Sequence, residues 1–241
     1  TVSRKDIIPD TSSSREVDDF LKNARDLAVH APASGPSQGR LIFAMDATAS
    51  RQPSWDRAAE IQAEMFDAVD GIGALDIQLV FFRGLSECKA SGWCRNAGTL
   101  RNYISKVSCH AGHTQIERVL AHVEREADTH KINALIYVGD CIEENPDHLA
   151  PIAGRLALKG VKAFMFQEGN DRDASFAFGE IARITGGAFM QFDAHSAAKL
   201  RKLLGAVASY AVGGHDGLSL YQKKTGSDDV LMLGHQLRKR S

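Results

Sequence analysis

Five residues with oxygen-bearing side chains stand where predicted strands end or predicted helices begin. They are two carboxylates and three hydroxyls: Asp46, Thr48, Ser50, Thr114 and Asp140. Oxygen atoms of this kind are the ligands that a hard divalent cation such as Mg²⁺ prefers. The residue types alone therefore point to a metal-binding chemistry, provided that the fold brings the five side chains together.

The positions of these residues fit one edge of a parallel sheet. Asp46 directly follows the apolar run 41–45, and Asp140 follows the apolar run 134–138 after one glycine. Such runs are typical of buried parallel strands. Thr114 stands at the start of a helical pattern. Because open α/β sheets bind ligands in the crevice beyond the carboxyl ends of their strands, we expect these groups to meet there.

Short apolar runs alternate with amphipathic stretches from residue 39 onward. The apolar runs predict strands at 41–45, 75–82, 86–93, 134–138, 161–167 and 188–192. The amphipathic stretches predict helices at 53–69, 99–107, 115–128, 147–158, 176–185 and 196–212. Alternating strands and helices imply right-handed crossovers. We therefore expect an α/β fold with a doubly wound, mostly parallel, Rossmann-like sheet, helices on both faces and 86–93 as a short antiparallel edge strand.

The chain divides into three predicted parts. Residues 1–38 form an N-terminal helix and linker, residues 39–212 the α/β domain, and residues 213–241 a C-terminal tail. Helical spacing at 14–27 and a Pro-, Gly- and Ser-rich stretch after it define the first part. The tail has weak periodicity, and we expect only a short docked piece at 230–233.

Composition narrows the classes of function. The 241 residues include 29 Lys and Arg against 30 Asp and Glu, a formal charge of −1 that gives no sign of a nucleic-acid partner. No apolar run approaches the roughly 20 residues that span a bilayer, so we expect no membrane insertion and a cytoplasmic protein. The cysteines form no C-x-x-C pair of a structural zinc site: Cys88, Cys94, Cys109 and Cys141.

The pattern resembles the von Willebrand factor A (vWA) domain family and its metal-ion-dependent adhesion site (MIDAS). The family's first motif, an Asp followed at alternate positions by two hydroxyl residues, matches Asp46, Thr48 and Ser50. Its glycine-threonine turn into a helix matches the segment that ends at Thr114. Its strand ending in an acidic residue matches Asp140. The resemblance covers roughly three quarters of the chain, and five ligand positions in the correct order are far more specific than one motif.

This resemblance implies a non-catalytic protein-interaction module. The five matched residues would hold Mg²⁺, with Mn²⁺ or Ca²⁺ as alternatives, and another protein would offer an Asp or Glu carboxylate to the ion. The sequence departs from the family at three positions. Thr48 replaces the commoner serine, His113 stands where a glycine is usual, and Cys141 stands where a glycine commonly follows the last aspartate.

Other interpretations remain open. A Mg²⁺-dependent hydrolase or phosphoryl-transfer enzyme would use the same carboxylates, although a dehalogenase-type phosphatase would want an Asp where Thr48 stands. A scaffold with a vestigial metal site fits the departures at His113 and Cys141. A transition-metal cluster of nearby Cys and His residues is a further alternative, although its C-H-x-x-H spacing is not a standard zinc pattern.

Overall fold

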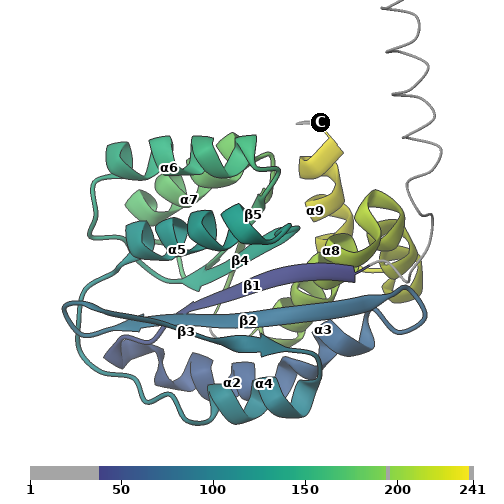
Figure 1. The fold of residues 1–241 in the computed structure, drawn as a ribbon, viewed down its shortest axis with the longest axis horizontal. Coiled ribbons are helices and arrows are strands. Elements are labelled where there is room, and N and C mark those ends of the chain that lie inside the picture. The colour runs from purple at the N-terminus through teal and green to yellow at the C-terminus, as the bar shows by residue number, and fades with distance from the viewer. Residues whose placement is uncertain (1–37, 194–195, 239–241) are drawn as a thin grey trace, which may run out of the picture. The chain divides into compact units, whose positions relative to one another are not determined.

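The computed structural model describes residues 38–193 and 196–238, except for the side chain of Ser50. The predicted helix at 14–27 lies outside the described residues. A six-stranded sheet forms the centre of this part of the chain, with helices on both faces (Figure 1). Its strands are β1 Gln38–Asp46, β2 Ala74–Arg83, β3 Glu87–Cys94, β4 Ala134–Gly139, β5 Lys162–Glu168 and β6 Ala188–Phe192.

The strand order is β3-β2-β1-β4-β5-β6. All neighbouring strands pair in parallel, except that β3 runs antiparallel to β2 at the edge. This architecture confirms the predicted doubly wound α/β fold and its antiparallel edge strand. Because β2 lies on one side of β1 and β4 on the other, the winding of the chain reverses at β1. That reversal opens a crevice at the carboxyl ends of β1 and β4.

The described helices are η1 Ala49–Arg51, α2 Gln52–Ile61, α3 Ala63–Asp67, α4 Ala97–Ile104, α5 Ile116–Thr129, α6 Pro146–Leu158, α7 Arg172–Thr185, α8 Ala197–Thr225 and α9 Asp228–Arg238. Figure 1 shows α5, α6 and α7 on one side of the sheet and α2 and α4 on the other. The predicted helix at 53–69 is divided into α2 and α3 at Gln62, whose backbone stays in the helical region.

Two hydrophobic clusters hold the layers together. Alternate residues of β1 point to opposite faces. Leu41 and Phe43 join the cluster beneath α2, α3, α4, α8 and α9, whereas Ile42 and Ala44 join the cluster beneath α5, α6 and α7. All four side chains are fully buried. The apolar run of β1 is continuous because both faces of the strand are covered.

The segment after residue 212 is helical, in contrast to the weakly structured tail that its sequence pattern predicts. Helix α8 continues to Thr225 through a kink at Gly214, whose φ of 59° favours glycine. The following helix, α9, then packs against α8 and β6. Gln236 hydrogen-bonds both backbone groups of Phe189 on the edge strand β6, at 3.0 and 2.9 Å. Residues 213–238 therefore complete the packed domain, and the predicted docked piece at 230–233 is part of a longer helix.

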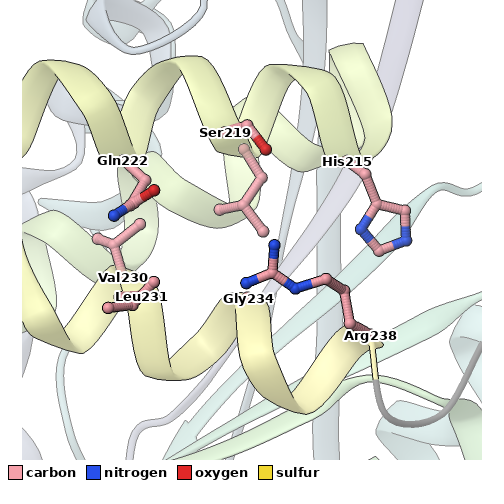
Figure 2. A pocket seen from close by; sticks show the side chains of 8 residues that line it. His215, Ser219, Gln222, Val230, Leu231, Gly234 and Arg238 are labelled. Carbon is pink, nitrogen blue, oxygen red and sulfur yellow. The ribbon is translucent and has the colours of Figure 1, made fainter.

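A cavity of about 160 Å³ separates α8 from α9 (Figure 2). Val230 and Leu231 line it on α9, and His215 and Gln222 line it on α8. None of the lining residues belongs to the predicted metal site. Within residues 38–193 and 196–238, no helix combines the length and the hydrophobicity that a membrane crossing requires.

Thr185 provides a test of how α7 is fastened to the sheet. Its buried hydroxyl donates to the Ile181 carbonyl at 2.8 Å and accepts from the Ala163 backbone N–H of β5 at 3.1 Å. We predict that Thr185→Val, which keeps the shape but leaves that N–H unpaired, lowers the free energy of unfolding by about 1–3 kcal/mol in urea titrations. Thr185→Ser retains the hydroxyl and is the matched control. Equal stability of Thr185→Val and the natural protein would contradict the prediction.

Candidate functional site

Asp46 ends β1 inside the crevice between β1 and β4. Its side chain is fully buried, and one carboxylate oxygen, Oδ1, accepts a hydrogen bond from the Thr48 backbone N–H at 2.7 Å. The Trp55 indole N–H donates to the Asp46 backbone carbonyl at 2.7 Å and so fixes the end of the strand. The other carboxylate oxygen, Oδ2, is buried and has no hydrogen-bond partner among the described residues. A buried carboxylate oxygen in this state is costly, which indicates a cation or water as its partner.

The electrostatics of Asp46 agree with this geometry. Burial raises the pKa of its carboxyl from 3.8 to about 6, and the negative charge of Asp140 adds to the rise. Hydrogen bonds from Thr48 and the positive charge of Arg51 act in the opposite direction but do not cancel it. Burial therefore outweighs the nearby positive charge, and the ionised form of Asp46 is disfavoured in the folded domain.

Thr114 is buried and tied to the loop that follows β4. Its hydroxyl accepts from the Glu143 backbone N–H at 2.9 Å, and its own backbone N–H donates to the Glu143 carboxylate at 2.9 Å. This reciprocal pair joins the glycine-threonine turn to the segment that carries Asp140. Because a hydroxyl oxygen has two lone pairs, Thr114 keeps one acceptor position for a further partner.

The glycine of this turn is required by a close backbone approach. A Cβ atom added to Gly112 would lie 2.2–2.4 Å from the backbone of Gly84. Gly84 has a φ of 60° and belongs to the turn between β2 and β3. Its carbonyl accepts hydrogen bonds from the His113 backbone N–H at 3.1 Å and the Gln115 side chain at 3.3 Å. The β2–β3 turn thus positions Thr114.

Arg51 is the functional candidate that the sequence patterns did not reveal. Its side chain is only 3% exposed, and its guanidinium lies 2.7 Å from the Glu168 carboxylate at the end of β5 and 3.9 Å from that of Asp140. Ser54 donates a 2.6 Å hydrogen bond to the same Glu168 oxygen. The one sequence feature that could have revealed Arg51 is its position directly after the Asp46-Ala47-Thr48-Ala49-Ser50 run. The crevice therefore contains a protein cation beside the predicted metal ligands.

The rim of the crevice is acidic, and its carboxylates have structural partners. Glu143 binds the His113 ring at 2.9 Å as well as Thr114, and Glu144 accepts from the Glu117 backbone N–H at 2.9 Å. Burial raises the pKa of the Cys141 thiol to about 12, and the charge of Asp140 adds to this rise. Glu143 and Glu144 thus accept hydrogen bonds from backbone N–H groups at the start of α5.

The fold brings Asp46, Thr48 and Asp140 to one crevice and joins Thr114 to it through Glu143. The side chain of Ser50, the fifth predicted ligand, lies outside the described residues. Among the described residues, no three His, Cys, Asp or Glu side chains form a cluster that could hold a metal. The two histidines of the transition-metal alternative contact other groups: the ring of His110 lies 3.1 Å from the Ser108 hydroxyl, and the ring of His113 contacts Glu143.

Comparison with known proteins identifies the fold. No family model matches the sequence, and no curated protein matches it. Solved structures do match. The vWF domain of the type V pili tip protein Mfa5 from Porphyromonas gingivalis superposes with a TM-score of 0.55 at 10% identity, over 73% of this chain and 95% of that one. The SpRpn10 VWA domain gives 0.50 at 9% identity, over 73% and 97%.

A third match carries a metal in its own adhesion site. Proximal thread matrix protein 1 from the mussel byssus, with a zinc-occupied MIDAS motif, superposes with a TM-score of 0.54 at 16% identity. The match covers 82% of this chain and 53% of that one, so this chain spans about half the length of the mussel protein. Together with the sheet order and the antiparallel edge strand, these matches show that the chain has the fold of a von Willebrand factor A domain.

Proposed function

We propose that this domain is a non-catalytic, metal-dependent protein-interaction module. Asp46, Thr48, Ser50, Thr114 and Asp140 would hold a divalent cation of the Mg²⁺ type, with Mn²⁺ or Ca²⁺ as alternatives. When bound, the ion supplies a positive charge that attracts an Asp or Glu carboxylate of another protein. The observation that carries this proposal is the buried Asp46 oxygen without a partner among the described residues.

The donor set fits such an ion. Asp46 and Asp140 offer carboxylate oxygens, and Thr48 and Thr114 offer neutral hydroxyls. If the hydroxyls coordinate directly and the two carboxylates act largely through water, the charge of the cation is only partly neutralised, so the ion retains affinity for another anionic oxygen. A zinc-occupied MIDAS motif in the mussel protein and the pilus-tip source of another match support the proposal by analogy of fold.

Arg51 favours a second candidate, a scaffold that works without a metal. Its buried guanidinium already supplies positive charge to Asp140 and Glu168. In this case the crevice would be held together by an internal ion pair, and partner binding would be indifferent to divalent ions. The two candidates differ in how the protein responds to metal, which is measurable without a known partner.

Thermal unfolding in EDTA, Mg²⁺, Mn²⁺ and Ca²⁺ tests the metal. An ion at about a hundred times its dissociation constant adds about 2.7 kcal/mol to the free energy of unfolding, which raises the midpoint by several degrees. We predict such a rise for the natural protein and none for Asp46→Ala. Asp216→Ala, which removes an exposed carboxylate from α8, is the control and should keep the rise. An unchanged midpoint of the natural protein in all three ions would favour the scaffold.

Asp46→Asn tests the cost of the buried charge in EDTA. Because the folded-state pKa of about 6 exceeds the ordinary 3.8, protonation favours the folded state; this stabilisation is complete below about pH 3.8 and is lost as pH rises through 6. Asp46→Asn removes the charge and keeps the acceptor for Thr48. We predict that it is more stable than the natural protein at pH 8, by up to about 3 kcal/mol, and that the difference shrinks towards pH 4. A difference that does not vary with pH in urea titrations would contradict this.

Arg51→Gln separates the two candidates. Loss of the guanidinium leaves the largely buried Glu168 carboxylate, 11% exposed, without its cation, so we predict a decrease of about 3 kcal/mol in the free energy of unfolding in EDTA. If the crevice is a metal site, Mg²⁺ restores part of this loss and shifts the midpoint more than in the natural protein. If Mg²⁺ leaves the Arg51→Gln midpoint unchanged, the crevice is not a cation site. Arg51→Lys keeps the charge and is the matched control.

A further inference from the structure

A second cavity, of about 270 Å³, lies between α5 and β3. Its volume is near the lower end of the roughly 300–1,000 Å³ that is usual for small-ligand pockets, so it suits one small ligand or one chemical group. The cavity exists because β3 is the edge strand and carries small side chains where α5 packs beside it. Cys88 and Ala90 on β3 and Ala121 on α5 line it.

The strand register places the β3 side of this cavity on the face that α5 covers. Cys88 pairs with Phe82, and Ala90 pairs with Val80. Phe82 and Val80 both belong to the hydrophobic cluster beneath α5, α6 and α7. Because directly opposed residues of neighbouring strands point to the same face, Cys88 and Ala90 also face α5.

The remaining lining residues are basic. They are Lys89 on β3 and Arg118, His122 and Arg125 on α5. The three helical residues follow an i, i+4, i+7 spacing, which puts them on one face of α5. None of the residues that line the cavity is acidic. Burial lowers the pKa of His122, and Lys89 is paired with Glu87 at 2.7 Å, so the positive charge at the cavity is that of Arg118 and Arg125.

Glu87 directly precedes Cys88 in β3, and its carboxylate is paired with other cations. Glu87 binds Arg83 at 2.8 Å and Lys89 at 2.7 Å. Within the described part of the chain, neither Arg118 nor Arg125 lies within ion-pair distance of a carboxylate.

The two guanidiniums are also placed at the cavity. The Arg118 guanidinium is held by a 2.6 Å hydrogen bond to the Ser86 carbonyl, and both arginines lower the pKa of the Cys88 thiol, which burial raises. Both positive charges therefore act at the Cys88 side of the cavity.

We propose that this cavity binds an oxyanion of the phosphate class. A phosphate group offers more acceptor oxygens and more negative charge than a carboxylate, and guanidiniums pair with phosphate through two parallel hydrogen bonds. Two arginines at one cavity, without an ion pair in the described part of the chain, match that chemistry. The proposal is independent of the metal site, because none of the lining residues belongs to the predicted ligand set.

Isothermal titration with inorganic phosphate at low ionic strength tests the proposal. We expect saturable binding with one phosphate per chain, and weaker binding at higher salt because the lining arginines are exposed. Arg118→Gln combined with Arg125→Gln should weaken the affinity by at least about tenfold, measured as the ratio of dissociation constants. The matched control, Arg101→Gln with Arg172→Gln, removes the same charge from exposed positions on α4 and α7 and should change the affinity less than about twofold.

A second variant tests whether the weaker phosphate binding of the double variant is caused by loss of folding. Ala121→Glu puts a carboxylate into the cavity four residues before Arg125, a spacing that stabilises helices. It should keep the thermal midpoint and lose phosphate binding. No saturable binding by the natural protein, or equal affinity in the double variant, would overturn the proposal, as would full binding by Ala121→Glu. Tighter binding of O-phosphoserine than of inorganic phosphate would identify an esterified phosphate as the ligand, and equal binding would identify the free ion.

Discussion

The parallel pairing of β1 with β2 on one side and β4 on the other is the constraint on which the crevice depends. The pairing aligns Met45 with Val138, so Asp46 and Gly139 come next on their two strands. Both strands end there, and the chain continues from each of them as a loop. Side chains that are 94 residues apart in sequence, Asp46 and Asp140, are thereby close enough for the charge of one to raise the pKa of the other.

Burial then decides what these side chains can do. In a low-dielectric crevice an unpaired carboxylate oxygen is costly, and so is an unpaired guanidinium. At Asp46 one carboxylate oxygen is unpartnered among the described residues, whereas the Arg51 guanidinium is paired with Glu168 and lies near Asp140. The buried, unpartnered oxygen of Asp46 therefore costs stability in the isolated domain.

Most of the fold was predictable because its signals are local. Apolar runs mark strands that are buried on both faces, and each predicted strand after residue 39 is present within a few residues of its expected bounds. The exception is the segment after residue 212. The glycine pair Gly213-Gly214 is typical of a helix end, yet Gly214 produces a kink within α8, and α9 then packs against β6. Tertiary packing outweighs a local stop signal there.

The sequence by itself determined the residue types of the candidate site, their order and the strand ends that carry them, because strand and turn signals depend on neighbours in the chain. Only the tertiary structure decided that Asp46 is buried with one oxygen unpartnered among the described residues and that Glu143 ties Thr114 to the loop after β4. It also decided that Arg51 pairs with Glu168, and that Arg118 and Arg125 face a cavity beside β3. Each of these depends on distances between residues far apart in the chain, which are set by sheet pairing and helix packing and leave no local pattern.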